Sequence, residues 1–346
     1  MRGLRRVLVR RLGMALFLMV GITAVTFMLS HVVPGDPVAT MLGDRGTDEQ
    51  ITRMRAQLGL DRPLVIQYGR YLWGLAHLDL GTSIRTRRPV VADLRDYFPA
   101  TVELATCALL LSLVLGIPLG VVSALRRDGP FDHGSRVFSL MGVSMPVYWL
   151  ALVLLGMLYG RWDVLPAGGR LSDFTIPPPR VTGLMLVDSL LALDGHAFLD
   201  AAWHLVLPSV CLAFLTTAVL ARMVRAQMLE VLGHDHVRMA RALGLSEARV
   251  VGVYALKNAL LPVVTLVGLA YGSLLSGAVL TETIFSWPGI GKYAVGSSTS
   301  LDFPALMGVT LLIAGIYSMV NLAVDLAYVA LDPRLRDGLG EGAADG

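Results

Sequence analysis

The chain has 346 residues, of which 55% are hydrophobic and only 16% are charged. Soluble domains carry about 25% charged residues, so an ordinary soluble enzyme is excluded, and the high apolar content excludes a disordered chain. The formal net charge of +3 gives no indication of nucleic-acid binding.

Six runs without Asp, Glu, Lys or Arg are long enough to cross a bilayer, which needs about 20 apolar residues. They cover residues 12–30, 104–125, 137–160, 205–221, 258–281 and 303–324. We expect Trp203 and His204 to extend the short fourth run. The first run is long for a signal peptide and lacks a small-residue cleavage site, so we expect a retained helix. The predicted fold class is an all-α polytopic membrane protein with six transmembrane helices.

The basic residues of the short connections predict the orientation in the membrane. One side has only Arg161, Arg170, Arg180 and Lys292. The other side has the N-terminal arginines, Arg126, Arg127, Arg136, the basic residues of 222–257, Arg334 and Arg336. We therefore expect both termini and 222–257 in the cytoplasm, and 31–103, 161–203 and 282–302 outside.

The polar segment 31–103 is patterned as helices. Thr47 and Gln50 have the spacing of a capping box, and Gly59 is placed to end the helix that follows. A second helix is expected after Pro63, with Val65, Tyr68 and Leu72 on one face. We expect a small external helical subdomain that rests on the membrane surface.

Three parts of the chain follow from this pattern. Residues 1–103 hold the first transmembrane helix and the external subdomain. Residues 104–336 hold a core of five transmembrane helices and a cytoplasmic loop. Residues 337–346, rich in Gly, Ala and acidic residues, form a flexible tail.

Small residues and prolines in the spans indicate either close helix packing or breaks that line a pathway. Both interpretations stay open for Gly116, Pro118, Gly120, Pro146, Gly268, Gly272 and Ser276.

No catalytic or metal-binding motif is visible. His234 and His236 are two residues apart and point to different helix faces, which disfavours a metal site. The segment 289–292 resembles the end of a phosphate-binding loop but lacks its first glycine, so we expect no ATP hydrolysis and no cofactor. An ion-coupled secondary transporter is the alternative class, but it would need charges in the middle of the spans.

The segment 229–262 predicts a helix–turn–helix elbow on the cytoplasmic side. A short helix should end at Gly244, and Ser246 can cap a second one. Leu243 and Leu245 would be exposed unless a partner covers them. The elbow could pack on its own domain, but a rigid, partly apolar projection is better suited to receive force from a soluble partner.

Residues 236–246 and 255–262 resemble the coupling segment of permeases from binding-protein-dependent ABC importers, peptide branch. The family's general consensus begins with Glu-Ala-Ala, where this chain has Arg238, Met239 and Ala240 before Gly244. Further motifs resemble the first permease subunit of dipeptide, oligopeptide and nickel importers: 34–37, 58–63, 79–81, 99–104, 116–120, 282–289 and 331–334. The long 161–203 insertion resembles the dipeptide type most closely.

The resemblance implies a permease subunit in the bacterial cytoplasmic membrane that carries no catalytic residues. Its partners would be a second homologous permease subunit, two ABC ATPase subunits and an external substrate-binding protein. Arg238, Met239, Ala240, Gly244, Leu245 and Ser246 would form the contact with the ATPases. Dipeptides or short peptides would be the substrate, with nickel, haem or longer oligopeptides as alternatives.

Overall fold

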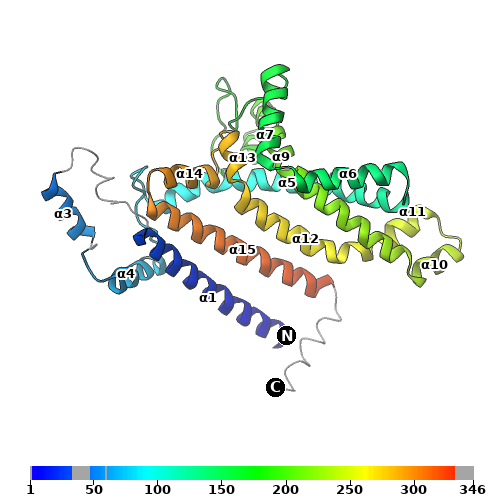
Figure 1. The fold of residues 1–346 in the computed structure, drawn as a ribbon, viewed down its shortest axis with the longest axis horizontal. Helices are drawn as coiled ribbons and strands as arrows, with labels where there is room; N and C mark the ends of the chain where they lie inside the picture. Colours follow the sequence, from blue (N-terminus) through cyan, green and yellow to red (C-terminus); the bar gives the residue numbers. More distant parts are fainter. Residues whose placement is uncertain (1, 33–46, 59–60, 332–346) are drawn as a thin grey trace. The chain divides into compact units, whose positions relative to one another are not determined.

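The structure is a computed structural model that describes residues 2–32, 47–58 and 61–331. Within these ranges the regular elements are helices, drawn in Figure 1. They are α1 (Arg2–Val32), α3 (Asp48–Leu58), α4 (Leu64–Ala76), α5 (Val90–Leu125), α6 (Pro130–Ser144), α7 (Val147–Leu154), η2 (Leu155–Arg161), α8 (Met185–Leu191), α9 (Gly195–Leu232), α10 (Asp235–Ala242), α11 (Glu247–Arg249), η3 (Val250–Ala255), α12 (Leu256–Gly277), α13 (Val279–Ile284), α14 (Ile290–Thr299) and α15 (Phe303–Leu331).

Five helical segments of the described chain are long and apolar enough to cross a membrane. They are Val9–Val32, Val90–Leu125, Gly195–Leu232, Glu247–Ser276 and Phe303–Leu326. A sixth span exists if α6 and the helix formed by α7 and η2 are counted as one. The all-α membrane fold expected from the sequence is confirmed.

The span expected over 137–160 is bent, and of the two interpretations left open for Pro146 the structure shows the helix break. The two halves of that span meet at 104°. Met145 and Pro146 both have extended backbones, with ψ of 123° and 131°. Proline has no N–H to donate and disfavours helical geometry in the residue before it. Pro146 therefore interrupts the helix where the apolar pattern continues without a change.

The chain divides into two compact units. Unit 1 comprises residues 1–101 and 288–318, and unit 2 comprises 102–287 and 319–346. The core of unit 1 joins the start of α5 to α14 and α15, through Val90, Leu94, Tyr293 and Val309. Two buried acids tie the preceding loop to it: Asp93 accepts a hydrogen bond from the Thr86 hydroxyl, and Asp302 accepts one from Ser83.

The helices of the N-terminal segment begin as the sequence predicts. The backbone N–H of Thr47 donates to Gln50 Oε1, and the backbone N–H of Gln50 donates to Thr47 Oγ1, which is the reciprocal pair of a capping box. The second expected helix is α4. Gly59 lies outside the described residues. On α4, Tyr68 and Leu72 are half-buried, whereas Val65 is exposed.

Helix α9 is the centre of unit 2. It has 38 residues, and α5, α6, α7, α8 and α12 pack around it. Its buried residues are mostly small or aliphatic, including Ala213, Ala218 and Ala221. Close packing of small residues is the main source of helix association in lipid, because apolar side chains gain little by leaving one apolar environment for another.

Glycines on the neighbouring helices allow the close approach to α9. A Cβ at Gly120 of α5 would lie 2.6 Å from the carbonyl oxygen of Ala221 and 2.7 Å from Val224 Cβ. A Cβ at Gly142 of α6 would overlap Ala218. Helix α5 continues through Pro118 without ending, so the Gly116–Gly120 stretch is a packing surface.

We predict that Gly120→Ala destabilises the protein, because the new methyl group must push α5 away from α9. The expected cost is about 1–3 kcal/mol, measured as a lower midpoint of thermal unfolding in detergent. Gly134→Ala on α6 is the matched control, since its Cβ meets nothing within 4 Å. It should leave the midpoint unchanged or raise it, because alanine favours a helix over glycine. Equal midpoints for the two variants would contradict the packing argument.

Candidate functional site

The predicted elbow is formed by α10 and α11. Helix α9 ends at Leu232, α10 covers Asp235–Ala242, and α11 begins after an extended residue, Ser246. The buried side chains of Val237, Ala240 and Val250 join the core that holds the C-terminal end of α9. The elbow is therefore part of a packed body.

The turn of the elbow is a Schellman motif. The N–H of Leu245 donates to the carbonyl of Ala240, and the N–H of Gly244 donates to the carbonyl of Arg241. Gly244 has a φ of 77°, which other residues adopt at a cost. The helix end expected at Gly244 is observed, with a positive φ at the glycine. Leu245 is half-buried and packs on the same core as Ala240, as the motif requires.

The expectation that both leucines of the turn are exposed is therefore half right. Leu243 is 69% exposed, and Met239, one helical turn earlier, is 65% exposed. Residues four apart lie on the same helix face. Together they form a ridge, here called the Met239–Leu243 ridge, that no described side chain of the elbow covers.

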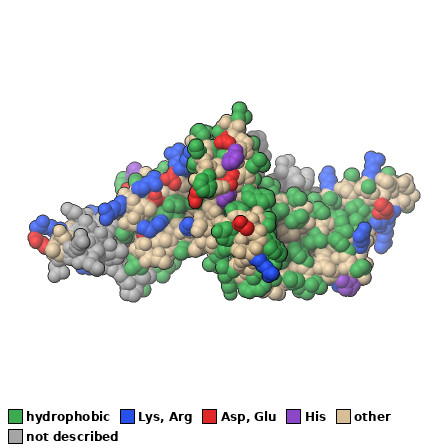
Figure 2. Space-filling view, turned by 90° about the horizontal axis from the view of Figure 1, so that it is seen from above, with side chains coloured by type: hydrophobic (Ala, Val, Ile, Leu, Met, Phe, Trp, Pro, Cys, Tyr) green, Lys and Arg blue, Asp and Glu red, His purple; other side chains and the backbone are tan. Residues whose placement is uncertain are grey.

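Charged groups stiffen and surround this ridge. Arg241 Nε donates to Glu247 Oε1 at 2.8 Å, which joins α10 to α11 across the turn. Arg238 is exposed and lies 3.6 Å from Asp235. Lys and Arg side chains gather where α10 and α11 lie in the view of Figure 2, and much of the remaining visible surface is hydrophobic. Ser246 takes the N-cap position, but its side chain makes no capping hydrogen bond, contrary to expectation.

The small residues of the fifth predicted span have different surroundings. A Cβ at Gly268 would overlap Val324 of α15, so this glycine is a contact point. Gly272 is buried, and the Ser276 hydroxyl donates to the Gly272 carbonyl within the same helix.

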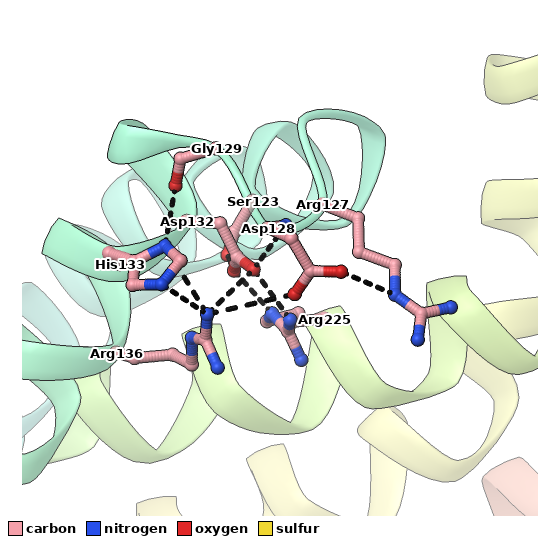
Figure 3. A network of polar contacts seen from close by, with 8 residues as sticks. All are labelled: Ser123, Arg127, Asp128, Gly129, Asp132, His133, Arg136 and Arg225. Atoms are coloured by element: carbon pink, nitrogen blue, oxygen red, sulfur yellow. Dashed lines mark hydrogen bonds and ion pairs between the residues drawn. The ribbon is translucent and has the colours of Figure 1, made fainter.

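A buried polar cluster that the sequence did not reveal lies where α5, α6 and α9 meet (Figure 3). Asp132 is fully buried and accepts two hydrogen bonds from Arg225, Nε to Oδ1 at 2.5 Å and Nη2 to Oδ2 at 2.7 Å. Ser123 and the backbone N–H of Asp128 also donate to it. Arg136 Nη2 lies 3.5 Å from the same carboxylate. The charge pattern counted Arg225 only as a topological signal.

A second polar cluster attaches the 161–203 segment to α5 at Glu103, twenty residues before Ser123 of the first cluster. Glu103 of α5 is buried and accepts hydrogen bonds from Arg170 Nη2 and from the backbone N–H of Leu186. Asp188 accepts from Thr182 and Gly183. Burial alone would raise the pKa of Asp188, but these hydrogen bonds outweigh it and the pKa is lowered. The carboxylates of Glu103 and Asp188 therefore hold the 161–203 segment in place through hydrogen bonds.

No group of three or more His, Cys, Asp or Glu side chains in the described ranges is arranged to hold a metal. The polar clusters are structural ion pairs, and the exposed feature is the elbow. These observations define a polytopic helical membrane protein with a rigid projection.

Comparison with known proteins identifies the family. Residues 116–337 match the model of the binding-protein-dependent transport system inner membrane component, and residues 4–105 match the model of the N-terminal part of such components. The chain belongs to this family and is a multi-pass inner membrane protein.

Three relatives align over nearly their whole length. The probable D,D-dipeptide transport system permease protein DdpB of Escherichia coli strain K12 is 50% identical over 93% of this chain and 94% of its own. The dipeptide transport system permease protein DppB of the same strain is 44% identical over 95% and 98%. A di/tripeptide transport system permease protein of Pseudomonas aeruginosa is 46% identical over 94% and 97%. These relatives are permease subunits.

We predict that Arg225→Met lowers the midpoint of thermal unfolding more than Asp132→Asn/Arg225→Met does. The single change leaves a buried carboxylate without its cation, which costs about 3–5 kcal/mol, whereas the double change removes both charges. Arg127→Met, at an exposed ion pair, is the control and should have little effect. A single variant as stable as the unmodified chain would show that the pair does not hold the three helices together.

Proposed function

We propose that this chain is the permease subunit of an ATP-driven importer that carries dipeptides or short peptides into the cell. The observation that carries the substrate class is the alignment, over more than nine-tenths of the chain, with relatives named for dipeptide or di/tripeptide transport. The substrate named for each relative is a property of that relative, and its transfer to this chain is the proposal.

The proposed assembly has five parts. A second, homologous permease subunit would complete the pathway, two ABC ATPase subunits would bind in the cytoplasm, and an external binding protein would deliver the peptide. The arginine asymmetry supports an orientation with both termini and the elbow in the cytoplasm. The family matches, which end at residue 105 and begin at 116, support a division into 1–103 and a permease core, 104–336.

The proposed coupling contact is the Met239–Leu243 ridge. ATP binding would close the two ATPase subunits, and a groove on each would move an elbow. Because Ala240, Val237 and Leu245 pack on the core around α9, the elbow would transmit that motion to the spans without bending. Arg238 and Arg241 border the ridge and would orient it on the partner.

One prediction of this proposal concerns the turn at Gly244. A valine there must adopt a left-handed backbone at a cost of about 1–2 kcal/mol, so Gly244→Val should disrupt the turn while the spans still insert. We expect normal membrane abundance, weaker co-purification of the ATPase subunits and loss of peptide uptake.

Gly252→Val is the matched control, because this glycine lies eight residues on, has open space around it and lacks a positive φ. It should retain peptide uptake and co-purification of the ATPase subunits.

The double variant Met239→Ser/Leu243→Ser keeps the turn and removes only the ridge. It should also fail to co-purify with the ATPase subunits. Full uptake by the ridge variant would overturn the coupling assignment. Expressed without the ATPase subunits, a Leu243→Cys variant lacking Cys107 and Cys211 should react with an impermeant thiol reagent only after the cells are opened.

Another prediction of this proposal concerns the substrate. In cells that carry the complete system, unlabelled dipeptides should compete with labelled dipeptide uptake, and free amino acids should not compete. The described spans lack a charged site in their middles that would trap one peptide end, which suits release. If deletion of this gene abolishes only nickel or haem uptake and leaves dipeptide use unchanged, the peptide assignment is wrong, although the permease assignment survives.

A further inference from the structure

The outward face of α4 is apolar, and the described contact on it comes from the end of the same helix, where the His77 ring lies 4.7 Å from the Trp73 ring. Trp73 is 71% exposed and Val65 is 83% exposed, and Ile66 is exposed beside them. These residues lie on one side of the helix by their spacing. A surface helix of a soluble protein would have charged residues on its outward face. The apolar face of α4 therefore requires apolar surroundings instead of water.

The opposite face of α4 packs against α1. This contact determines how deep α4 lies in the membrane relative to the end of α1. The Tyr68 hydroxyl lies 2.9 Å from Thr23 Oγ1 and donates to the Val20 carbonyl at 3.2 Å. The Phe27 ring lies 5.3 Å from the Tyr68 ring and 6.2 Å from the Tyr71 ring.

The apolar span of α1 ends at Val32. At 1.5 Å per residue, Phe27 is about 7.5 Å inside that end. Gln67 of α4 lies 3.2 Å from His31, at the end of the span, whereas the Tyr68 hydroxyl reaches Thr23 and Val20, about 13.5 and 18 Å inside it. Helix α4 therefore lies beside the outer part of a transmembrane helix, from the headgroup boundary inward, and its Tyr68 side chain reaches further into the acyl-chain region. Interfacial helices bury their apolar face by about 5–10 Å at this boundary.

The basic residues in and just before α4 are also consistent with a place at the membrane interface. Arg62 and Arg70 are exposed and have no carboxylate partner among the described residues. There is no acidic residue between Arg62 and His77. Tryptophan is enriched at the membrane interface, where its ring sits among headgroups, and arginine can reach lipid phosphates from there.

We propose that α4 is an interfacial helix whose Val65–Trp73 face is embedded in the phospholipid surface, and that it anchors the end of α1 at that depth. The partner is lipid. A protein groove could cover an apolar face equally well, but the packing on the end of a transmembrane span places this face where lipid is the surrounding medium. Arg62 and Arg70 supply the charge complementarity to phosphate.

The test measures the surroundings of this face directly. In a background with Cys107→Ser and Cys211→Ala, spin labels are placed by Val65→Cys or Trp73→Cys, and the complete transporter is reconstituted in phosphatidylethanolamine and phosphatidylglycerol vesicles. The control label replaces Arg53 of α3, an exposed charged residue. Collision rates with oxygen, which concentrates in lipid, and with a water-soluble nickel chelate are then compared.

We expect labels at 65 and 73 to collide mainly with oxygen and the label at 53 mainly with the nickel chelate. Labels at 65 and 73 that resemble the label at 53 would place the face in water and overturn the proposal. Labels that collide with neither reagent would show a covering protein and would also overturn it.

A second measurement avoids cysteine substitution. Lipids brominated near the headgroup should quench part of the tryptophan fluorescence of the unmodified complex, and Trp73→Phe should reduce the quenched fraction. Trp287→Phe is the comparison, because Trp287 is buried in unit 2 and should not contribute. Unchanged quenching in Trp73→Phe would contradict lipid contact at this face.

Discussion

The close approach of neighbouring helices to α9 is the constraint on which unit 2 depends. In lipid there is little hydrophobic gain from bringing two apolar helices together, so shape must supply the contact. Gly116 and Gly120 of α5 and Gly142 of α6 provide flat surfaces for Ala218 and Ala221 of α9. The elbow and the 161–203 segment are both continuous with this packed group, which gives them a fixed base.

Buried charges lie at the two ends of the packed helices and leave the middle apolar. Glu103 and Ser123 are twenty residues apart on α5, which corresponds to about 30 Å, the thickness of a hydrocarbon core. Glu103 binds Arg170 of the 161–203 segment, and Ser123 joins the Asp132 and Arg225 pair. Charges at these levels hold loops and helix ends in place without the cost of a charge at the bilayer centre.

The elbow gains its rigidity from three separate interactions. The Schellman turn determines its angle, the buried side of α10 attaches it to the core, and the Arg241–Glu247 pair closes the opposite side. Helix α10, which exposes Met239 and Leu243, is thereby fixed to the end of α9 and, through η3, to the start of α12.

The sequence by itself determined the class of protein, the spans and the elbow, because the length of an apolar run and the φ of a glycine turn are local properties. The capping box at Thr47 and the turn at Gly244 were predictable for the same reason. The tertiary structure decided which residues meet across the chain. The Asp132–Arg225 pair and the contacts of Gly120 and Gly142 with α9 join residues that are distant in sequence. No pattern along the chain encodes those contacts, since they arise only when α5, α6 and α9 pack together.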